Sequence, residues 1–407
     1  MNRMTMAKRN TDEQFVSRRR LLTTGAALGV GAAVGVGVDR TVNASPDVVT
    51  STHGATTIPF YGKHQAGIET EPAAHATFIA FNLNDDVDRP ALIRLMRLVT
   101  DSASRLTQGQ PALADTEAGL ARNPSRLTVT FGFGPGFVAR AKGIAPSWLA
   151  PLPPFSIDKL EERWNGGDLL LQVSADDPVS VSHTVRVLTK DARSFASIHW
   201  RQDGFRHAPG TLKPGTTMRN LFGQVDGTVN PEPGSKDFAQ VVWANKGWWA
   251  DGTSLVLRRI AMNLDTWDPV SRVGREEAIG RRLDTGAPLT GTAEHDVPDL
   301  DAKDHQGLTV IAEYAHIRRS QTGDAAEVIF RRPYNYDLAP EGVESSASGL
   351  LFASYQADVT KQFVPIQRRL DELDMLNEWT TPIGSAVFVI PPGCRKGGYI
   401  GETLLEV

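Results

Sequence analysis

Hydrophobic and polar residues follow one another along the chain in short stretches that predict strands and helices. Residues 76–83 (ATFIAFNL) are an apolar run with β-branched and aromatic side chains, which is typical of a buried strand. Residues 90–100 carry apolar side chains at helical spacing. The same criteria predict strands over 127–133 and 168–174, and a helix over 178–189 capped by Asp176 or Asp177. The order of this part is β-α-β-β-α.

The pattern begins again after the Pro- and Gly-rich segment 209–215. The elements predicted there are strands over 254–260, 327–330, 350–356 and 385–390, and helices over 272–283 and 360–370. Two α+β halves of ferredoxin-like type, packed as a pair, fit this order. Since no sequence repeat is obvious, we expect a structural duplication only. The domains predicted are 58–215 at the N-terminal side and 216–407 at the C-terminal side.

The first residues have the order of a cleavable export signal. Residues 17–22 (SRRRLL) place an arginine cluster before the uncharged, Gly- and Ala-rich run 21–38, and 42–44 (VNA) follow. This run is slightly short and rich in glycine for a membrane-spanning helix, which makes spanning the weaker interpretation. The segment resembles a twin-arginine signal, which exports folded proteins, although Leu21 stands where that pattern often has Phe. We therefore assign residues 1–44 to the signal peptide and 45–57, rich in Ser and Thr, to a linker.

Composition narrows the chemistry. The 407 residues are 41% hydrophobic and 22% charged with a net charge of -4, so the chain is globular and has no basic surface that would indicate nucleic-acid binding. Cys394 is the one cysteine, which excludes a disulfide framework and a thiolate-ligated metal site within the chain. A metal or a cofactor iron must therefore rely on the nine histidines or on carboxylates.

Two patterns invite a functional interpretation that their spacing does not support. The segment 286–307 combines four aspartates with two histidines, but no calcium-loop spacing is present, so a solvated loop is favoured over a hard-cation site. The glycines at 132, 134 and 136 are too close together for a dinucleotide-binding fingerprint, and they predict a turn.

Four short stretches carry more specific information. Residues 219–231 (RNLFGQVDGTVNP) place a single carboxylate, Asp226, among glycines and turn formers, and Gly227 allows the backbone to approach another group closely. The other three stretches are 316–319 (HIRR), 329–336 (IFRRPYNY) and 349–352 (GLLF). Each alone has an ordinary structural explanation.

Taken together and in this order, these stretches resemble the dye-decolorising peroxidases, whose signature is glycine, two residues, aspartate and glycine. The resemblance runs from about Pro59 to the C-terminus and includes 63–68 (KHQAGI) and 355–358 (YQAD). It is most similar to the twin-arginine-exported branch of that family. The family implies a pair of ferredoxin-like domains, of the dimeric α+β barrel type, with one haem b per chain in the C-terminal domain.

The resemblance assigns roles residue by residue. His316 matches the proximal histidine that holds the haem iron, and Asp226 matches the distal aspartate. Arg331, the first arginine of the pair after the strand, matches the distal arginine better than Arg332 does. The remaining cofactor-binding positions are Gly227, beside the aspartate, and Leu350 and Phe352, which match apolar residues over the distal face. A second carboxylate should accept the other N–H of His316, and the sequence does not choose among Asp358, Asp371 and Asp374.

These roles form a coherent chemistry for hydrogen peroxide. Asp226 can take a proton from one peroxide oxygen and return it to the other, under mildly acidic conditions, because aspartates in model peptides titrate near pH ~3.9. Arg331 can stabilise the charge that develops as the O–O bond breaks. Dyes and phenols are too bulky to pass Leu350 and Phe352, so surface aromatics could carry their electrons inward. The candidates are Trp243, Trp248, Trp249, Tyr334 and Tyr336, for which packing is an equal explanation.

Two other functions stay open. The exported branch includes proteins proposed to release iron from haem beside iron-uptake components, and recovery of iron with intact porphyrin would identify that activity. A non-enzymatic haem-binding module is the second alternative, and Asp226→Ala would then leave every activity unchanged. The expected partners are hydrogen peroxide and small-molecule reductants, with a homo-oligomer left open and no nucleic acid. We expect an extracellular, periplasmic or membrane-surface location.

Overall fold

The computed structural model describes residues 53–321, 323–340, 342 and 345–406, and these described residues form one compact unit. The signal peptide predicted over 1–44, with its arginine cluster, lies outside the described residues, as does most of the linker predicted over 45–57. Within the described ranges, every helix is too short or too polar to cross a membrane.

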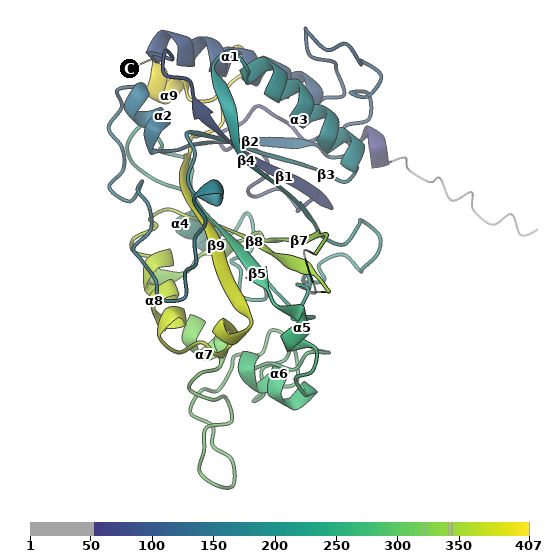
Figure 1. The fold of residues 1–407 in the computed structure, drawn as a ribbon, viewed down its shortest axis with the longest axis vertical. Helices are drawn as coiled ribbons and strands as arrows, with labels where there is room; N and C mark the ends of the chain where they lie inside the picture. Colours follow the sequence, from purple (N-terminus) through teal and green to yellow (C-terminus); the bar gives the residue numbers. More distant parts are fainter. Residues whose placement is uncertain (1–52, 322, 341, 343–344, 407) are drawn as a thin grey trace, which may run out of the picture. The chain divides into compact units, whose positions relative to one another are not determined.

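The first half of the compact unit is a four-stranded antiparallel sheet covered by two helices. Figure 1 shows α1 and α3 side by side over these strands. The sheet has the order β2-β3-β1-β4. The elements are β1 (His75–Leu83), α1 (Arg89–Leu106), β2 (Thr128–Phe133), α2 (Pro135–Arg140), β3 (Leu169–Ala175), α3 (Pro178–Ala192) and β4 (Ala196–Phe205).

The second half repeats this order of strands with different helices. β9 pairs with β5, β5 with β8, and β8 with β7 and β6. The strands are β5 (Thr253–Met262), β6 (Phe330–Arg331), β7 (Tyr334–Leu338), β8 (Ala347–Gln356) and β9 (Thr380–Ile390). The helices are α4 (Lys236–Val242), α5 (Leu264–Trp267), α6 (Arg272–Ile279), α7 (His316–Ser320), α8 (Phe363–Leu373) and α9 (Glu402–Leu405).

The strand orders establish the fold class. Counted within each half, both sheets have the order fourth, first, third, second, which is that of a ferredoxin-like domain. The halves join where Phe133 of β2 pairs with Val389 of β9 and where Phe205 of β4 pairs with Asn335 of β7, so the strands close into a ring. Side chains from alternate strand positions fill its interior as one apolar cluster. The predicted pair of ferredoxin-like α+β halves is therefore confirmed, whereas the boundary at 215/216 stays a prediction.

Local chemistry explains why the two long helices of the first half begin where they do. Asp88 accepts a hydrogen bond from the backbone N–H of Ala91, and Pro90 occupies the first turn of α1. Asp177 caps α3 in the same way through Val179, which decides between the two predicted caps. The apolar residues predicted at helical spacing in 90–100 all lie on the buried face of α1.

Several predicted elements differ from the structure. The helix predicted over 272–283 ends at Ile279, because Gly280 adopts a left-handed conformation (φ 85°) that closes the helix. The strand predicted over 327–330 is wrong except at Phe330, since Glu327 ends a 3₁₀ turn. The helix predicted over 360–370 begins only at Phe363. Of the glycines predicted to form a turn, Gly132 lies in β2, Gly134 is the N-cap of α2 and Gly136 lies inside α2.

Candidate functional site

A cavity of about 520 Å³ lies in the second half of the chain. This volume falls within the ~300–1,000 Å³ of sites that hold small molecules and cofactors. The loop 220–229, strands β5, β6 and β8, and helices α7 and α8 all contribute to its wall. The lining side chains with a predicted or evident chemical role are Asp226, Arg258, Arg281, His316, Arg331, Leu350 and Phe352.

His316 is the first residue of α7 and lines this cavity. Its Nδ1 lies 2.6 Å from Oδ2 of Asp374, while Oδ1 of Asp374 accepts a hydrogen bond from the backbone N–H of Leu376 at 3.0 Å. The carboxylate is thus fixed and holds the imidazole proton on Nδ1. Nε2 of His316 has no hydrogen-bond partner among the described residues, so its lone pair is available to a metal ion.

The environment of His316 raises the basicity of its imidazole. Burial lowers the pKa of His316, but the charge and the hydrogen bond of Asp374 raise it by more, and the net pKa lies above the ordinary value. The charge of Arg331 lowers and the charge of Asp226 raises the same pKa, each by less than Asp374 raises it.

The structure distinguishes the three carboxylates that the sequence left open. Asp374 alone of the three contacts His316. Asp371 instead accepts hydrogen bonds from the Ser156 hydroxyl at 2.7 Å and from the Ile157 N–H at 3.0 Å. Asp358 caps a turn through Thr360 and Lys361. Asp374 is therefore the carboxylate placed to support the histidine.

Asp226 and Arg331 form an ion pair at the same cavity. Nη1 of Arg331 donates to Oδ1 of Asp226 at 2.7 Å, and the two side chains are 22% and 7% exposed. Oδ2 of Asp226 has no hydrogen-bond partner in the described part of the chain. One carboxylate oxygen is thus held by a fixed cation, and the other is available to a ligand in the cavity.

Two local features fix the backbone around this ion pair. Gly227 has φ 125°, a conformation that other residues rarely adopt, and it turns the chain directly after Asp226. Asn230 then donates from Nδ2 to the Arg331 carbonyl at 2.7 Å and accepts from the Arg331 N–H at 2.9 Å. The loop that carries Asp226 is thereby attached to the strand that carries Arg331.

Strand alternation separates the lining residues from their neighbours in sequence. Arg332 points away from the cavity, donates to the Ile68 carbonyl and is buried, and burial lowers its pKa to about 10. Leu350 and Phe352 line the cavity, whereas Leu351 between them belongs to the apolar interior of the strand ring. The structure thus brings His316, Asp226, Gly227, Arg331, Leu350 and Phe352 to one cavity.

The residues of the cavity fit a haem. An imidazole with a free Nε2 and a carboxylate on Nδ1 is a standard donor for haem iron. The wall is largely apolar, as a porphyrin ring requires, through side chains such as Ile260, Met262, Ile366 and Leu370. Arginines at the wall can neutralise the two carboxylates that a haem carries.

Sequence reasoning missed several residues of this wall. Arg281 was placed inside a helix, but it follows the glycine that ends α6, and a glycine after a helical run is the signal that could have found it. Arg258 of β5 forms an ion pair with Asp158, which belongs to the first half of the chain. No local pattern could have paired residues 100 positions apart.

The five aromatic candidates for electron transfer all lie outside the cavity lining. Tyr334, Tyr336 and Trp249 are buried, and the Tyr336 hydroxyl donates to the carbonyl of Ile260, a residue that does line the cavity. Trp243 and Trp248 are partly exposed. Trp243 stacks on the His64 ring at 3.8 Å.

The acidic segment 286–307 belongs to the long loop between α6 and α7, which extends away from the strands in Figure 1. Its aspartates hold turns. Asp296 accepts backbone hydrogen bonds from Thr292 and Ala293, and Asp304 accepts them from Gln306 and Leu308. Such contacts are those of Asx turns in a solvated loop.

Comparison with known protein families extends this description. The model described as Dyp-type peroxidase, N-terminal, matches residues 65–206, and the model described as Dyp-type peroxidase, C-terminal, matches residues 217–395. A dye-decolorizing peroxidase of Thermobifida fusca is 37% identical, with 84% of each chain covered. A deferrochelatase of Escherichia coli K12 is 33% identical, with 96% of this chain and 97% of that protein covered.

Solved structures agree with these matches. A DyP-type peroxidase from Cellulomonas bogoriensis superposes with a TM-score of 0.85 at 52% identity and covers 87% of this chain and 99% of its own. Ferric DtpA from Streptomyces lividans gives a TM-score of 0.83 at 38% identity, with 87% and 98% covered.

Proposed function

Because the chain belongs to the Dyp-type peroxidase family and is a haem-dependent peroxidase, we propose that His316 binds the iron of one haem b per chain and that Asp226 and Arg331 act on hydrogen peroxide. The observation that carries this proposal is the convergence of two charged pairs, His316 with Asp374 and Asp226 with Arg331, on one cavity. When bound, haem supplies the redox-active iron at which peroxide is reduced.

Asp226 is the acid-base group of the proposed reaction. Its Oδ2 would accept a proton from one oxygen of hydrogen peroxide and return it to the other oxygen, which leaves as water. Oδ1 stays bound to Arg331, which orients the carboxylate so that one proton acceptor faces the cavity. Proton transfer of this kind typically contributes ~10²- to 10⁴-fold to a rate.

Arg331 stabilises negative charge as the O–O bond breaks. Its guanidinium is permanently charged and is fixed by Asp226 on one side and, through the backbone, by Asn230. Leu350 and Phe352 contribute apolar side chains to the cavity wall, where they would admit a ligand as small as peroxide and exclude bulky reductants.

One-electron donors such as dyes and phenols would then reduce the oxidised enzyme by giving electrons to residues at its surface. Trp243 and Trp248 are the candidates that such donors can reach, since the other three aromatic residues are buried. Replacing either tryptophan by phenylalanine should lower dye turnover and leave the reaction with peroxide unchanged. If dye turnover stays intact, that tryptophan has no part in electron transfer.

Absorption spectroscopy tests the haem site directly. Protein matured with haem is recorded as wild type, His316→Ala and Asp226→Asn, before and after one equivalent of hydrogen peroxide. We expect a Soret band that shifts with peroxide in wild type, is lost or altered in His316→Ala, and shifts much more slowly in Asp226→Asn. A wild type that binds no haem would refute the proposal.

A second activity at this site is release of iron from haem, which is supported by the relatives named deferrochelatase. Recovery of iron together with intact porphyrin would identify it. If iron appears only with broken porphyrin, the metal comes from oxidative damage during peroxidase turnover. Association with iron-uptake components would be expected only in the first case.

We further propose export by the twin-arginine route to the outside of the cell, the periplasm or the outer face of the cell membrane. The arginine cluster at 17–22 and the weakly apolar run behind it support this proposal. Replacing the three arginines Arg18, Arg19 and Arg20 by lysine should retain the protein in the cytoplasm. Normal export of that variant would rule out the route.

A further inference from the structure

Three arginines line the cavity, and they differ in whether a carboxylate neutralises their positive charge. Arg331 is paired with Asp226 at 2.7 Å, and Arg258 is paired with Asp158. Arg281 forms no ion pair with any carboxylate in the described part of the chain. A buried cation is normally paired, so Arg281 calls for an explanation.

The hydrogen bonds of Arg281 go to backbone carbonyls alone. Its Nη1 donates to the carbonyls of Gly286 and Glu294, each at 2.7 Å, and the residue is only 7% exposed. The carboxylate of Glu294 is engaged elsewhere, by the hydroxyls of Thr217 at 2.6 Å and Thr228 at 3.0 Å. Nε and Nη2 of Arg281 therefore have no partner among the described residues.

The charge of Arg281 is poorly compensated where it lies. Burial lowers its pKa, the more distant charge of Glu294 raises it, and the neighbouring Arg331 lowers it again. Arg281 and Arg331 thus both line the cavity, and Asp226 is paired with Arg331. An anionic ligand group beside Arg281 would remove this repulsion.

We propose that Arg281 binds a carboxylate of the haem. The inference rests on the proposed function, because it requires that haem occupies the cavity. A guanidinium presents parallel donors that match the two oxygens of a carboxylate, and such charge-assisted pairs are about twice as strong as neutral ones. Arg281 is the cavity arginine without a carboxylate partner among the described residues, so it fixes the orientation of the porphyrin rather than taking part in the reaction.

The experiment compares two porphyrins that differ only in these carboxylates. Apoprotein of wild type and Arg281→Gln is titrated with haem and with haem dimethyl ester, and dissociation constants are read from the Soret band. We expect wild type to prefer haem over its ester. Arg281→Gln should lose roughly 10- to 100-fold of that preference. The glutamine removes the positive charge of Arg281, and the ester removes the negative charge of the haem carboxylate that this arginine would bind.

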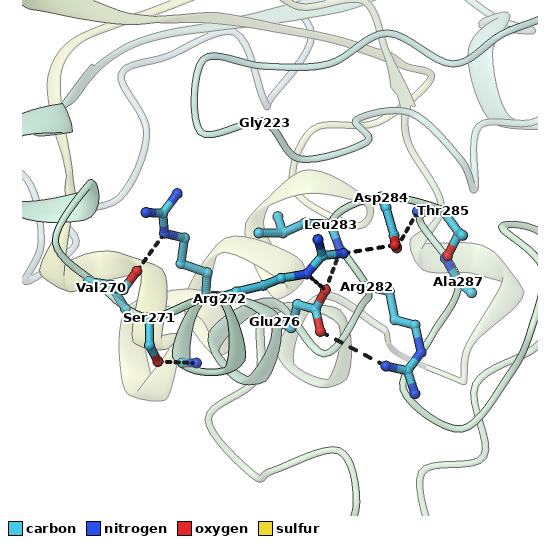
Figure 2. Close-up of polar contacts among 12 residues, drawn as sticks. Gly223, Val270, Ser271, Arg272, Glu276, Arg282, Leu283, Asp284, Thr285 and Ala287 are labelled. Carbon is cyan, nitrogen blue, oxygen red and sulfur yellow. Dashed lines mark hydrogen bonds and ion pairs between the residues drawn. The ribbon is translucent and has the colours of Figure 1, made fainter.

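Arg282 provides the matched control. It adjoins Arg281, its side chain is 51% exposed, and it points toward Glu276 with 4.0 Å between Nη1 and Oε2 (Figure 2). Arg282→Gln should keep the wild-type preference for haem. Arg281→Lys, which retains the charge, should fall between wild type and Arg281→Gln, and it serves also if the glutamine variant fails to fold.

The outcomes separate the inference from the function on which it rests. If wild type binds neither porphyrin, the haem site itself is wrong. If wild type binds haem but Arg281→Gln weakens haem and ester equally, Arg281 only holds the loop 286–294 and the inference is overturned. A lysine variant whose preference equals or exceeds that of wild type would overturn it as well.

Discussion

Asn230 and Arg331 lie 101 residues apart in sequence and exchange two hydrogen bonds, one in each direction, between the Asn230 side chain and the Arg331 backbone. This contact attaches the loop of Asp226 to strand β6, so both members of the ion pair between Asp226 and Arg331 depend on it. Neither residue reaches the other through regular sheet pairing, since Arg331 pairs with Ser354 of β8.

Asn230→Ala should therefore slow the reaction with peroxide without expelling haem. Displacement of a catalytic group by about 1 Å can cost ~10²-fold, so we expect kcat/KM for hydrogen peroxide to fall roughly 10- to 100-fold. Stopped-flow spectroscopy at the Soret band measures this rate, and the exposed Glu232→Gln is the control. Equal rates for Asn230→Ala and wild type would show that Arg331 keeps its position without the contact.

Asp374→Asn should lower haem affinity and peroxide reactivity through its effect on His316. An asparagine can still accept the hydrogen bond from the Leu376 N–H, but it removes the negative charge from Nδ1 of His316. Loss of such a supporting carboxylate typically costs ~10–100-fold in metal affinity or activity. The measurement is haem affinity together with peroxide reactivity. Asp371→Asn, which changes a carboxylate with no contact to His316, should leave both near wild type.

Strands and helices with a clear local hydrophobic pattern were predictable from the sequence. The contacts between these elements were not. The run 76–83 and the spaced apolar residues of 90–100 are local signals, and the structure has β1 and α1 there. β4 gave no such signal, because its exposed positions break a strict alternation and its pairing with β1 shifts register between Ala80 and Phe81. Helix α7 is five residues long, too short for a helical period to show.

The site shows the same division. His316, Asp226 and Arg331 were chosen as candidates because they lie in stretches whose sequence resembles that of a known family. The choice of Asp374 over Asp371 depends on the three-dimensional structure, since both residues lie at the end of one helix and their side chains point to different partners. Arg281 was overlooked because the helix was expected to continue past Gly280.

Asp371 makes stability depend on pH. Burial raises the pKa of Asp371, but the hydrogen bonds from Ser156 and Ile157 and the charge of Arg258 lower it by more, so the net pKa lies below the ordinary value. A carboxyl whose folded pKa is depressed stabilises the protein above its unfolded pKa, about 3.9, and loses this contribution as the pH falls through the folded value.

Asp371→Asn should thus lower the free energy of unfolding by about 1–3 kcal/mol at pH 7. The difference from wild type should shrink as the pH falls below about 4, because the wild-type carboxyl then becomes neutral as well. Denaturant unfolding of the apoprotein at a series of pH values measures both effects. A difference that stays constant down to pH 3 would show that the hydrogen bonds, and not the charge, provide the stabilisation.

The ion pair between Arg258 and Asp158 joins the two halves beside the cavity, with side chains 1% and 9% exposed. Asp158→Asn should destabilise the apoprotein by about 3–5 kcal/mol, because it leaves a buried guanidinium without its counter-charge. Lys63→Met is the control, since its pair with Asp251 is 67% and 47% exposed and such surface pairs contribute ~0–1 kcal/mol. Replacing both buried partners, as Arg258→Met with Asp158→Leu, should recover most of the loss, because no buried charge then remains. The double variant could instead have the same free energy of unfolding as Asp158→Asn. The ion pair would then stabilise the protein by positioning the segment 155–158 beside the cavity, and not by charge compensation.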